Sequence, residues 1–209
     1  MKLTRSILVL ALTFMVLGAP AFAQFDLQIT EVDPFGTDFA DPDEPDDVEW
    51  IEVTNLGDTA WADADGILHY DDNEPNFENA DPISGVTSIA PGESVIFVNH
   101  DDAFPDPSGE NGIAQFLTEF PDYAGQIGSY SGSGLSSSGE DGASLWVGMP
   151  TSNDEIVSTL VFPAASQVEG QTYSPAGWGA PTPGSVVPEP AAGLMAVFGM
   201  VGLLAIRRR

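Results

Sequence analysis

Apolar residues along this chain gather in short runs that fit strands better than helices. The runs are at most eight residues long, are rich in Val, Ile, Phe and Trp, and are bounded by Gly, Asp, Asn or Pro. They are FDLQITEV (25–32), WIEVTN (50–55), GILHY (66–70), SVIFVN (94–99), ASLWVG (143–148) and EIVSTLVF (155–162). In the first run Phe25, Leu27 and Ile29 alternate with other residues and so share one strand face. This pattern predicts an all-β sandwich or barrel.

One segment has helical spacing instead. In GIAQFLTEFP (112–121), apolar residues recur at i, i+3, i+4 and i+7, namely at Ile113, Phe116, Leu117 and Phe120. The proline that follows cannot continue a helix. We therefore expect a helix of at most two turns that crosses and caps one end of the sandwich.

The beginning of the chain has the three parts of a secretory signal peptide. Residues 1–23 contain the cations Lys2 and Arg5, an apolar stretch, and a small-x-small cleavage site that ends at Ala23. Cleavage there makes Gln24 the first residue of the mature chain. The alternative is a membrane helix that is retained, and the shortness of the apolar stretch favours cleavage.

The distribution of charge excludes several function classes. The chain has five Lys and Arg, all near its ends, and residues 24–206 contain none. Of the 32 acidic residues, 31 lie between residues 24 and 187. Without cations the body cannot neutralise nucleic-acid phosphates, hold a phosphate-binding loop or form a Schiff base. It also has no cysteine, which excludes disulfides, thiolate nucleophiles and cysteine metal sites.

Two acid-rich stretches are candidate metal sites. Seven of the twelve residues 38–49 are acidic, and a second cluster lies within residues 71–82. Hard oxygen ligands on loops suit Ca²⁺, although neither stretch has the spacing of an EF-hand. The predicted ligands are Asp41, Asp43, Glu44, Asp46 and Asp47. The alternative is a solvated acidic loop that keeps the protein soluble.

Residues for catalysis are few. The two histidines, His69 and His100, lie about thirty residues apart, and the chain has no G-x-S-x-G nucleophile motif. Two His are too few to indicate a zinc site by themselves. We expect no enzymatic activity, with a hydrolase of extracellular polymers as the alternative. Trp178 and Tyr173, in a Pro/Gly-rich tail, are candidates for an exposed sugar-stacking platform.

Short motifs occur in a recognisable order from residue 29 to residue 184. They are ITEV (29–32), WIEVTN (50–55), DADGIL (63–68), IAPG (89–92), a glycine-bounded hairpin and strand pair (134–147 and 156–162), and PTPG (181–184). This order resembles the lamin-tail domain, an immunoglobulin-like β-sandwich also found in exported bacterial proteins. Ile67 stands where that family usually has tryptophan. The resemblance implies a single domain over residues 24–184 and no shared catalytic residues, and another immunoglobulin-like or jelly-roll sandwich is the alternative.

The end of the chain, residues 185–209, resembles a PEP-CTERM sorting signal. It contains Pro188-Glu189-Pro190, an apolar run over residues 191–206, and Arg207, Arg208 and Arg209. Sixteen helical residues span roughly 24 Å, which is short for a ~30 Å hydrocarbon core. The segment would therefore anchor the chain in a membrane only marginally. The three arginines favour the cytoplasmic side. The resemblance implies a transient inner-membrane anchor that an exosortase-type enzyme recognises, and the alternative is a tail anchor that is never cut.

These features together predict an exported protein at the cell surface or in the extracellular matrix of a Gram-negative-type bacterium. We expect it to act by binding or assembly with extracellular polysaccharide or matrix proteins, with Ca²⁺ as the candidate cofactor. The alternatives are an extracellular polymer hydrolase and a Ca²⁺-dependent adhesion module. Nucleic acid is excluded as a partner by the charge of the body.

Overall fold

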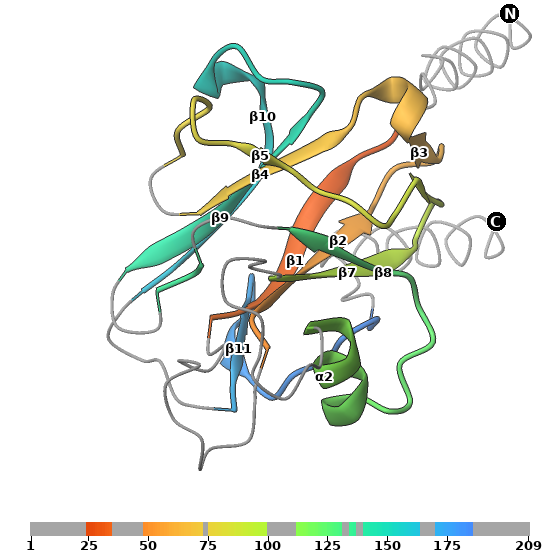
Figure 1. Ribbon diagram of the computed structural model, residues 1–209, viewed down its shortest axis with the longest axis vertical. Coiled ribbons are helices and arrows are strands. Elements are labelled where there is room, and N and C mark those ends of the chain that lie inside the picture. Colours follow the sequence, from red (N-terminus) through yellow and green to blue (C-terminus); the bar gives the residue numbers. More distant parts are fainter. Residues whose placement is uncertain are drawn as a thin grey trace, which may run out of the picture.

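The structure is a computed structural model that describes residues 24–34, 48–72, 75–99, 112–130, 134–136, 140–163 and 170–185. Nearly half of these residues lie in strands, far more than in helices (Figure 1). In chain order the elements are β1 (Leu27–Asp33), β2 (Trp50–Asn55), β3 (Trp61–Ala62), the 3-10 helix η1 (Asp63–Asp65), β4 (Leu68–Asp72), β5 (Asp81–Pro82), β6 (Ser88–Ile89), β7 (Ser94–Asn99), α2 (Gly112–Glu119), β8 (Ile127–Tyr130), β9 (Asp141–Val147), the 3-10 helix η2 (Asn153–Glu155), β10 (Ile156–Phe162), β11 (Thr172–Ser174) and β12 (Gly177–Gly179).

Two sheets pack against each other. A six-stranded sheet has the order β12-β11-β1-β2-β7-β8, and a four-stranded sheet has the order β10-β9-β4-β5, while β3 and β6 form a small separate pair. Neighbouring strands are antiparallel except β7 and β8, which are parallel. Ile29, Val53 and Phe97 from the first sheet share one buried cluster with Leu145 and Leu160 from the second. The all-β prediction is confirmed, and each of the six predicted runs contributes a strand.

The strands β2 and β7 are buried on both faces, which explains why their sequences do not alternate. Ile51 and Val53 face the main core between the sheets, whereas Trp50 faces a second buried cluster that contains Phe116 of α2. The rings of Trp50 and Phe116 meet edge to face, with centroids 5.7 Å apart. The predicted helix is therefore present, but it covers the outer face of the six-stranded sheet beside β7 and β8 (Figure 1) rather than capping an end. Leu117, predicted on its apolar face, is 40% exposed.

A β-bulge interrupts β1. The register with β2 shifts between Ile29 and Glu31, so the apolar alternation that begins at Leu27 and Ile29 resumes at Val32. Glu31 then lies opposite Glu52 on the outer face of the sheet, where the chain around residues 172–184 buries both carboxylates.

The described strands on either side of the glycine-rich stretch, β8 and β9, do not pair with each other, so they do not form the predicted hairpin. Tyr130 ends β8 in the six-stranded sheet, whereas Asp141 begins β9 in the four-stranded sheet, so residues 131–140 connect the two sheets. The second half of that prediction is confirmed, because β9 pairs with β10 in antiparallel register. The parallel strand β8 was not predicted from the sequence.

Candidate functional site

One end of the sandwich concentrates the buried carboxylates. The strand registers bring Asp33 beside Trp50, and Asn99 beside Tyr130, so β1, β2, β7 and β8 all have an end there. The chain from Tyr130 leads through Leu135 and Ser136 to Asp141, which begins β9 at the same place. We call this region the acidic end; its described carboxylates are Asp33, Glu49, Asp71, Asp72 and Asp141.

Glu49, which directly precedes β2, is the most strongly perturbed group at the acidic end. Its Oε1 accepts hydrogen bonds from the Tyr130 hydroxyl at 2.5 Å and from Asn99 Nδ2 at 3.1 Å. Its Oε2 accepts the backbone N–H of Leu135 at 2.7 Å. Glu49 is only 7% exposed, and burial raises the pKa of its carboxyl to about 8, against the lowering effect of these hydrogen bonds. It is therefore largely neutral at pH 7.

Two polar atoms beside Glu49 lack hydrogen-bond partners among the described residues. They are the hydroxyl of Tyr70, a residue only 2% exposed, and Asn99 Oδ1. The Tyr70 ring packs on Tyr130 with centroids 4.3 Å apart. Burial, and then the charge of Glu49, raise the pKa of both tyrosines well above the usual value. A neutral Glu49 adds a hydrogen-bond donor to a site where Asn99 Oδ1 is an acceptor without a partner among the described residues.

The aspartates of the acidic end are held by backbone groups. Both oxygens of Asp141 accept backbone N–H groups, those of Ser136 and Gly142. Asp71 Oδ2 accepts the N–H of Asn76 at 2.8 Å. Burial, followed by the nearby charge of Asp141, raises the pKa of Asp72 to about 6. In the part of the chain that the structure describes, no three Asp, Glu or His side chains are grouped to hold a metal ion.

The predicted Ca²⁺ ligands Asp41, Asp43, Glu44, Asp46 and Asp47 lie outside the described residues. The residues that flank them are described. Pro34 follows the end of β1 and Val48 precedes Glu49, so this acid-rich segment joins the body at the acidic end. The second acid-rich stretch, residues 71–82, begins with the last two residues of β4, and Asp72 lies near Glu49 at the acidic end.

A second buried pair, Glu31 and Glu52, was not predicted from the sequence. Glu31 accepts hydrogen bonds from the hydroxyls of Thr172 and Thr182 and from the backbone N–H of Thr182 at 2.9 Å. Glu52 accepts the N–H of Gly184 at 2.6 Å, and burial raises its pKa to about 7. These bonds fix the PTPG segment across β1 and β2, so this pair has a structural role.

Among the described candidate catalytic and sugar-stacking residues, none is a fully exposed side chain. His69 is buried, with Nδ1 3.1 Å from the carbonyl oxygen of Ile67, and His100 lies outside the described residues. Trp178 and Tyr173 are half-buried and pack on Phe162, with ring centroids 5.9 and 6.2 Å away. Their rings therefore extend the core, and the predicted exposed platform is wrong.

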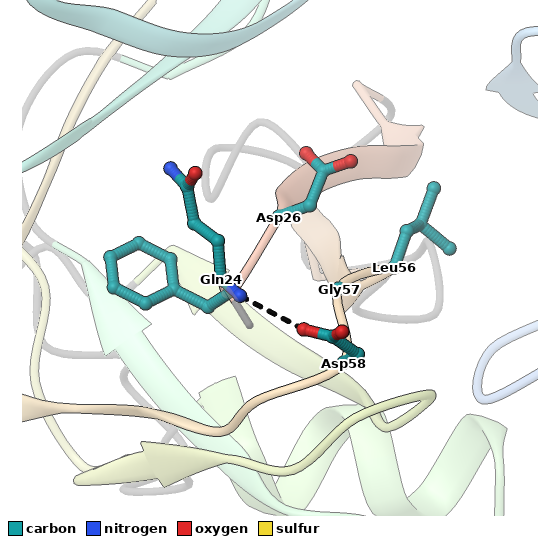
Figure 2. A pocket seen from close by; sticks show the side chains of 6 residues that line it. Gln24, Asp26, Leu56, Gly57 and Asp58 are labelled. Carbon is teal, nitrogen blue, oxygen red and sulfur yellow. Dashed lines mark hydrogen bonds between the residues drawn. The ribbon is translucent and has the colours of Figure 1, made fainter. Parts of the chain in front are cut away.

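Of the predicted residues of the two terminal signals, only Gln24 is described. Those outside the described residues are Ala23, Pro188, Glu189, Pro190, Arg207, Arg208 and Arg209. The backbone N–H of Gln24 donates to Asp58 Oδ1 at 2.9 Å, in a shallow surface depression at the opposite end from Glu49 (Figure 2). Among the described helices, none is long and apolar enough to cross a membrane.

The chain was compared with known proteins in three ways. No protein-family model, no curated protein and no solved structure matches it at a significant level.

Proposed function

We propose that this protein is an exported component of the cell surface or extracellular matrix that acts by binding or assembly and not by catalysis. The observation that carries the proposal is the pair of signals at its two ends. A leader ends at Ala23, and Pro188-Glu189-Pro190 precedes an apolar run and three arginines. Between them lies a body without lysine or arginine. The arginines favour the cytoplasmic side of a membrane, which leaves the acidic body outside.

The lamin-tail interpretation is supported by where the quoted motifs lie. ITEV lies within β1, WIEVTN is β2, and IAPG shortly precedes β7. These three strands are neighbours in one sheet. The last strand pair, β9 and β10, belongs to the facing sheet. Two packed, mainly antiparallel sheets are the layout of an immunoglobulin-like sandwich. Ile67, at the family's tryptophan position, is 51% exposed, and the buried aromatic nearby is Trp61.

Sorting follows from the C-terminal signal. An exosortase-type enzyme would recognise Pro188-Glu189-Pro190 while the apolar run holds the chain in the inner membrane. The run spans only roughly 24 Å, and a marginal anchor of this kind suits a transient stage before release.

The acidic end is the binding surface in this proposal. The acid-rich segment that contains Asp43 and Asp47 joins the body there, next to Glu49. Carboxylate oxygens are the ligands that Ca²⁺ prefers, and extracellular Ca²⁺ modules bind with dissociation constants of about 0.1–1 mM. A Ca²⁺ ion held by these carboxylates would let a strongly anionic body bind anionic polysaccharide or a matrix protein.

Sorting can be tested with one conservative substitution. Glu189→Gln removes the only charge of Pro188-Glu189-Pro190, and Glu140→Gln removes the same charge from an exposed site in the body. In the native host, we expect the wild type and Glu140→Gln at the surface or in the medium. Glu189→Gln should remain in the membrane fraction. An unchanged distribution of Glu189→Gln would contradict the proposal.

The proposed binding of Ca²⁺ is tested by thermal unfolding of the purified protein in Ca²⁺, Mg²⁺ and NaCl at matched ionic strength. We expect stabilisation by Ca²⁺ beyond the other two salts, and its loss in a double variant with Asp43→Asn and Asp47→Asn. The exposed pair Asp63→Asn and Asp154→Asn is the control for charge alone. Equal shifts in all three salts would mean that the salts only screen repulsion among the carboxylates.

A further inference from the structure

The first described residues are bound along the turn that follows β2. Leu56 donates its backbone N–H to the carbonyl oxygen of Asp26 at 2.7 Å, and Asp58 donates to that of Gln24 at 3.2 Å. Residues 24–26 therefore continue the line of β1 beyond Leu27 and lie against the turn, as Figure 2 shows.

The turn is shaped to receive this segment. Asn55 Oδ1 accepts the N–H groups of Asp26 and Gly57, and Asn55 Nδ2 donates to the carbonyl oxygens of Thr59 and Ile89. A Cβ atom on Gly57 would lie 2.2 Å from the carbonyl oxygen of Gln24, so only glycine permits this approach. Asn55, Gly57 and Asp58 thus form a built site for residues 24–26.

The last contact of the site involves the backbone nitrogen of Gln24, the atom that removal of residues 1–23 would change. Gln24 N donates to Asp58 Oδ1 at 2.9 Å. In the full-length chain this nitrogen is a neutral amide, but removal of residues 1–23 converts it into an α-amino group. We propose that Asp58 is a binding site for the protonated α-amino group of Gln24, which forms an ion pair that only the processed chain can make. This inference rests on the proposed cleavage after Ala23.

The new amino group has a special place in this chain. Residues 24–206 contain no lysine or arginine, so apart from two histidines the α-amino group is the body's sole cationic group. It is formed beside a carboxylate in a body with 31 acidic residues. An adjacent negative charge favours the protonated amine and raises its pKa above the model-peptide range of about 7.7–8.0.

The size of the effect is limited by exposure. Gln24 and Asp58 are both exposed, and exposed ion pairs are weak because water screens them. We expect the neighbouring carboxylate to raise the pKa of the α-amino group only modestly, which slows acylation at neutral pH roughly two- to fivefold.

The composition of the chain makes this measurable. In the full-length chain the primary amines are the α-amino group of Met1 and the side chain of Lys2, whereas the processed chain has only the α-amino group of Gln24. We would express the full-length chain in a host with signal peptidase and label the purified protein with acetic anhydride over a range of pH. Mass spectrometry of the N-terminal peptide identifies the labelled group, and the pH dependence of the rate gives its pKa. The variants are Asp58→Asn, which keeps an acceptor oxygen and removes the charge, and Glu140→Gln, which removes an exposed charge elsewhere in the body.

The expected result is label on Gln24, with a pKa that falls in Asp58→Asn and is unchanged in Glu140→Gln. Label on Gln24 with the same pKa in the wild type and Asp58→Asn would overturn the inference and leave the proposed cleavage intact. Label on Met1 or Lys2 would overturn both. A Gln24 that has cyclised, with its α-nitrogen bonded to its own Cδ and ammonia released, would support cleavage and overturn the ion pair.

Discussion

Replacement of Glu49 by Gln should reduce by about 3–4 kcal/mol the stability that the protein loses between pH 5 and pH 8. Glu49 binds its proton more tightly in the folded chain, because burial raises its pKa from 4.5 to about 8. Between these two values the folded state carries more protons than the unfolded state. The free energy of unfolding therefore falls as the pH rises through this window.

The magnitude follows from the pKa shift. One pKa unit corresponds to about 1.4 kcal/mol, so ionisation of Glu49 in the unfolded chain destabilises the fold by about 3 kcal/mol at pH 7. Below the unfolded-state pKa of 4.5 the carboxyl is neutral in both states and this cost is absent. Burial also raises the pKa of Glu52 to about 7 and of Asp72 to about 6, so these groups add to the same trend in the wild type.

Glutamine keeps the shape of the neutral acid but not all of its hydrogen bonds. Its carbonyl oxygen can accept from the Tyr130 hydroxyl, but its amide nitrogen then replaces Oε2 and cannot accept the backbone N–H of Leu135. At pH 5 we therefore expect Glu49→Gln to be about 1–3 kcal/mol less stable than the wild type.

Urea unfolding of the purified protein at pH 5 and pH 8 provides the test. Between pH 5 and pH 8 the wild type should lose about 3–4 kcal/mol more stability than Glu49→Gln, and the exposed control Glu140→Gln should follow the wild type at both values. If Glu49→Gln loses as much stability as the wild type between pH 5 and pH 8, Glu49 is not the neutral buried acid described above.

Three further substitutions test the packing. Gly57→Ala should destabilise the fold or release residues 24–26, because its Cβ would lie 2.2 Å from the Gln24 carbonyl oxygen. Faster amide hydrogen exchange at residues 26–28 would show the release, and Gly179→Ala, with open space around its Cβ, is the tolerated control. Phe116→Ala should cost about 3–5 kcal/mol by urea unfolding, since Phe116 is fully buried against Trp50, and the exposed Leu117→Ala should cost far less. Thr182→Val removes a 2.9 Å hydrogen bond to the buried Glu31 and should cost about 1–3 kcal/mol, with the exposed Thr118→Val as its control.

The strands were predictable because their apolar runs have little ambiguity. WIEVTN and SVIFVN coincide with β2 and β7. The position of α2 was not predictable, because periodicity gives a helix an apolar face and does not say which surface it covers. Trp50 and Ile96, on the outer face of β2 and β7, could have indicated a covering element. The bulge after Ile29 was equally hidden, since a single extra residue leaves no mark in the composition.

The acid-rich segments were predicted from composition alone, but Glu49 was not singled out among the carboxylates. Its perturbation arises from Tyr130, Asn99 and Leu135, which lie 50 or more residues away in the sequence. Long-range contacts of this kind follow only from the sheet order. The connection from β8 to β9 shows the same limit, because glycine and serine indicate a turn without saying that it joins two sheets.

The central claim, export followed by C-terminal sorting, is tested most directly by the intact mass of the protein recovered from the native cell surface or medium. The account predicts a chain that begins at Gln24 and has lost the apolar run and Arg207, Arg208 and Arg209. A surface protein that retains Met1, or a chain that keeps Arg209 and stays in the membrane fraction, would contradict it.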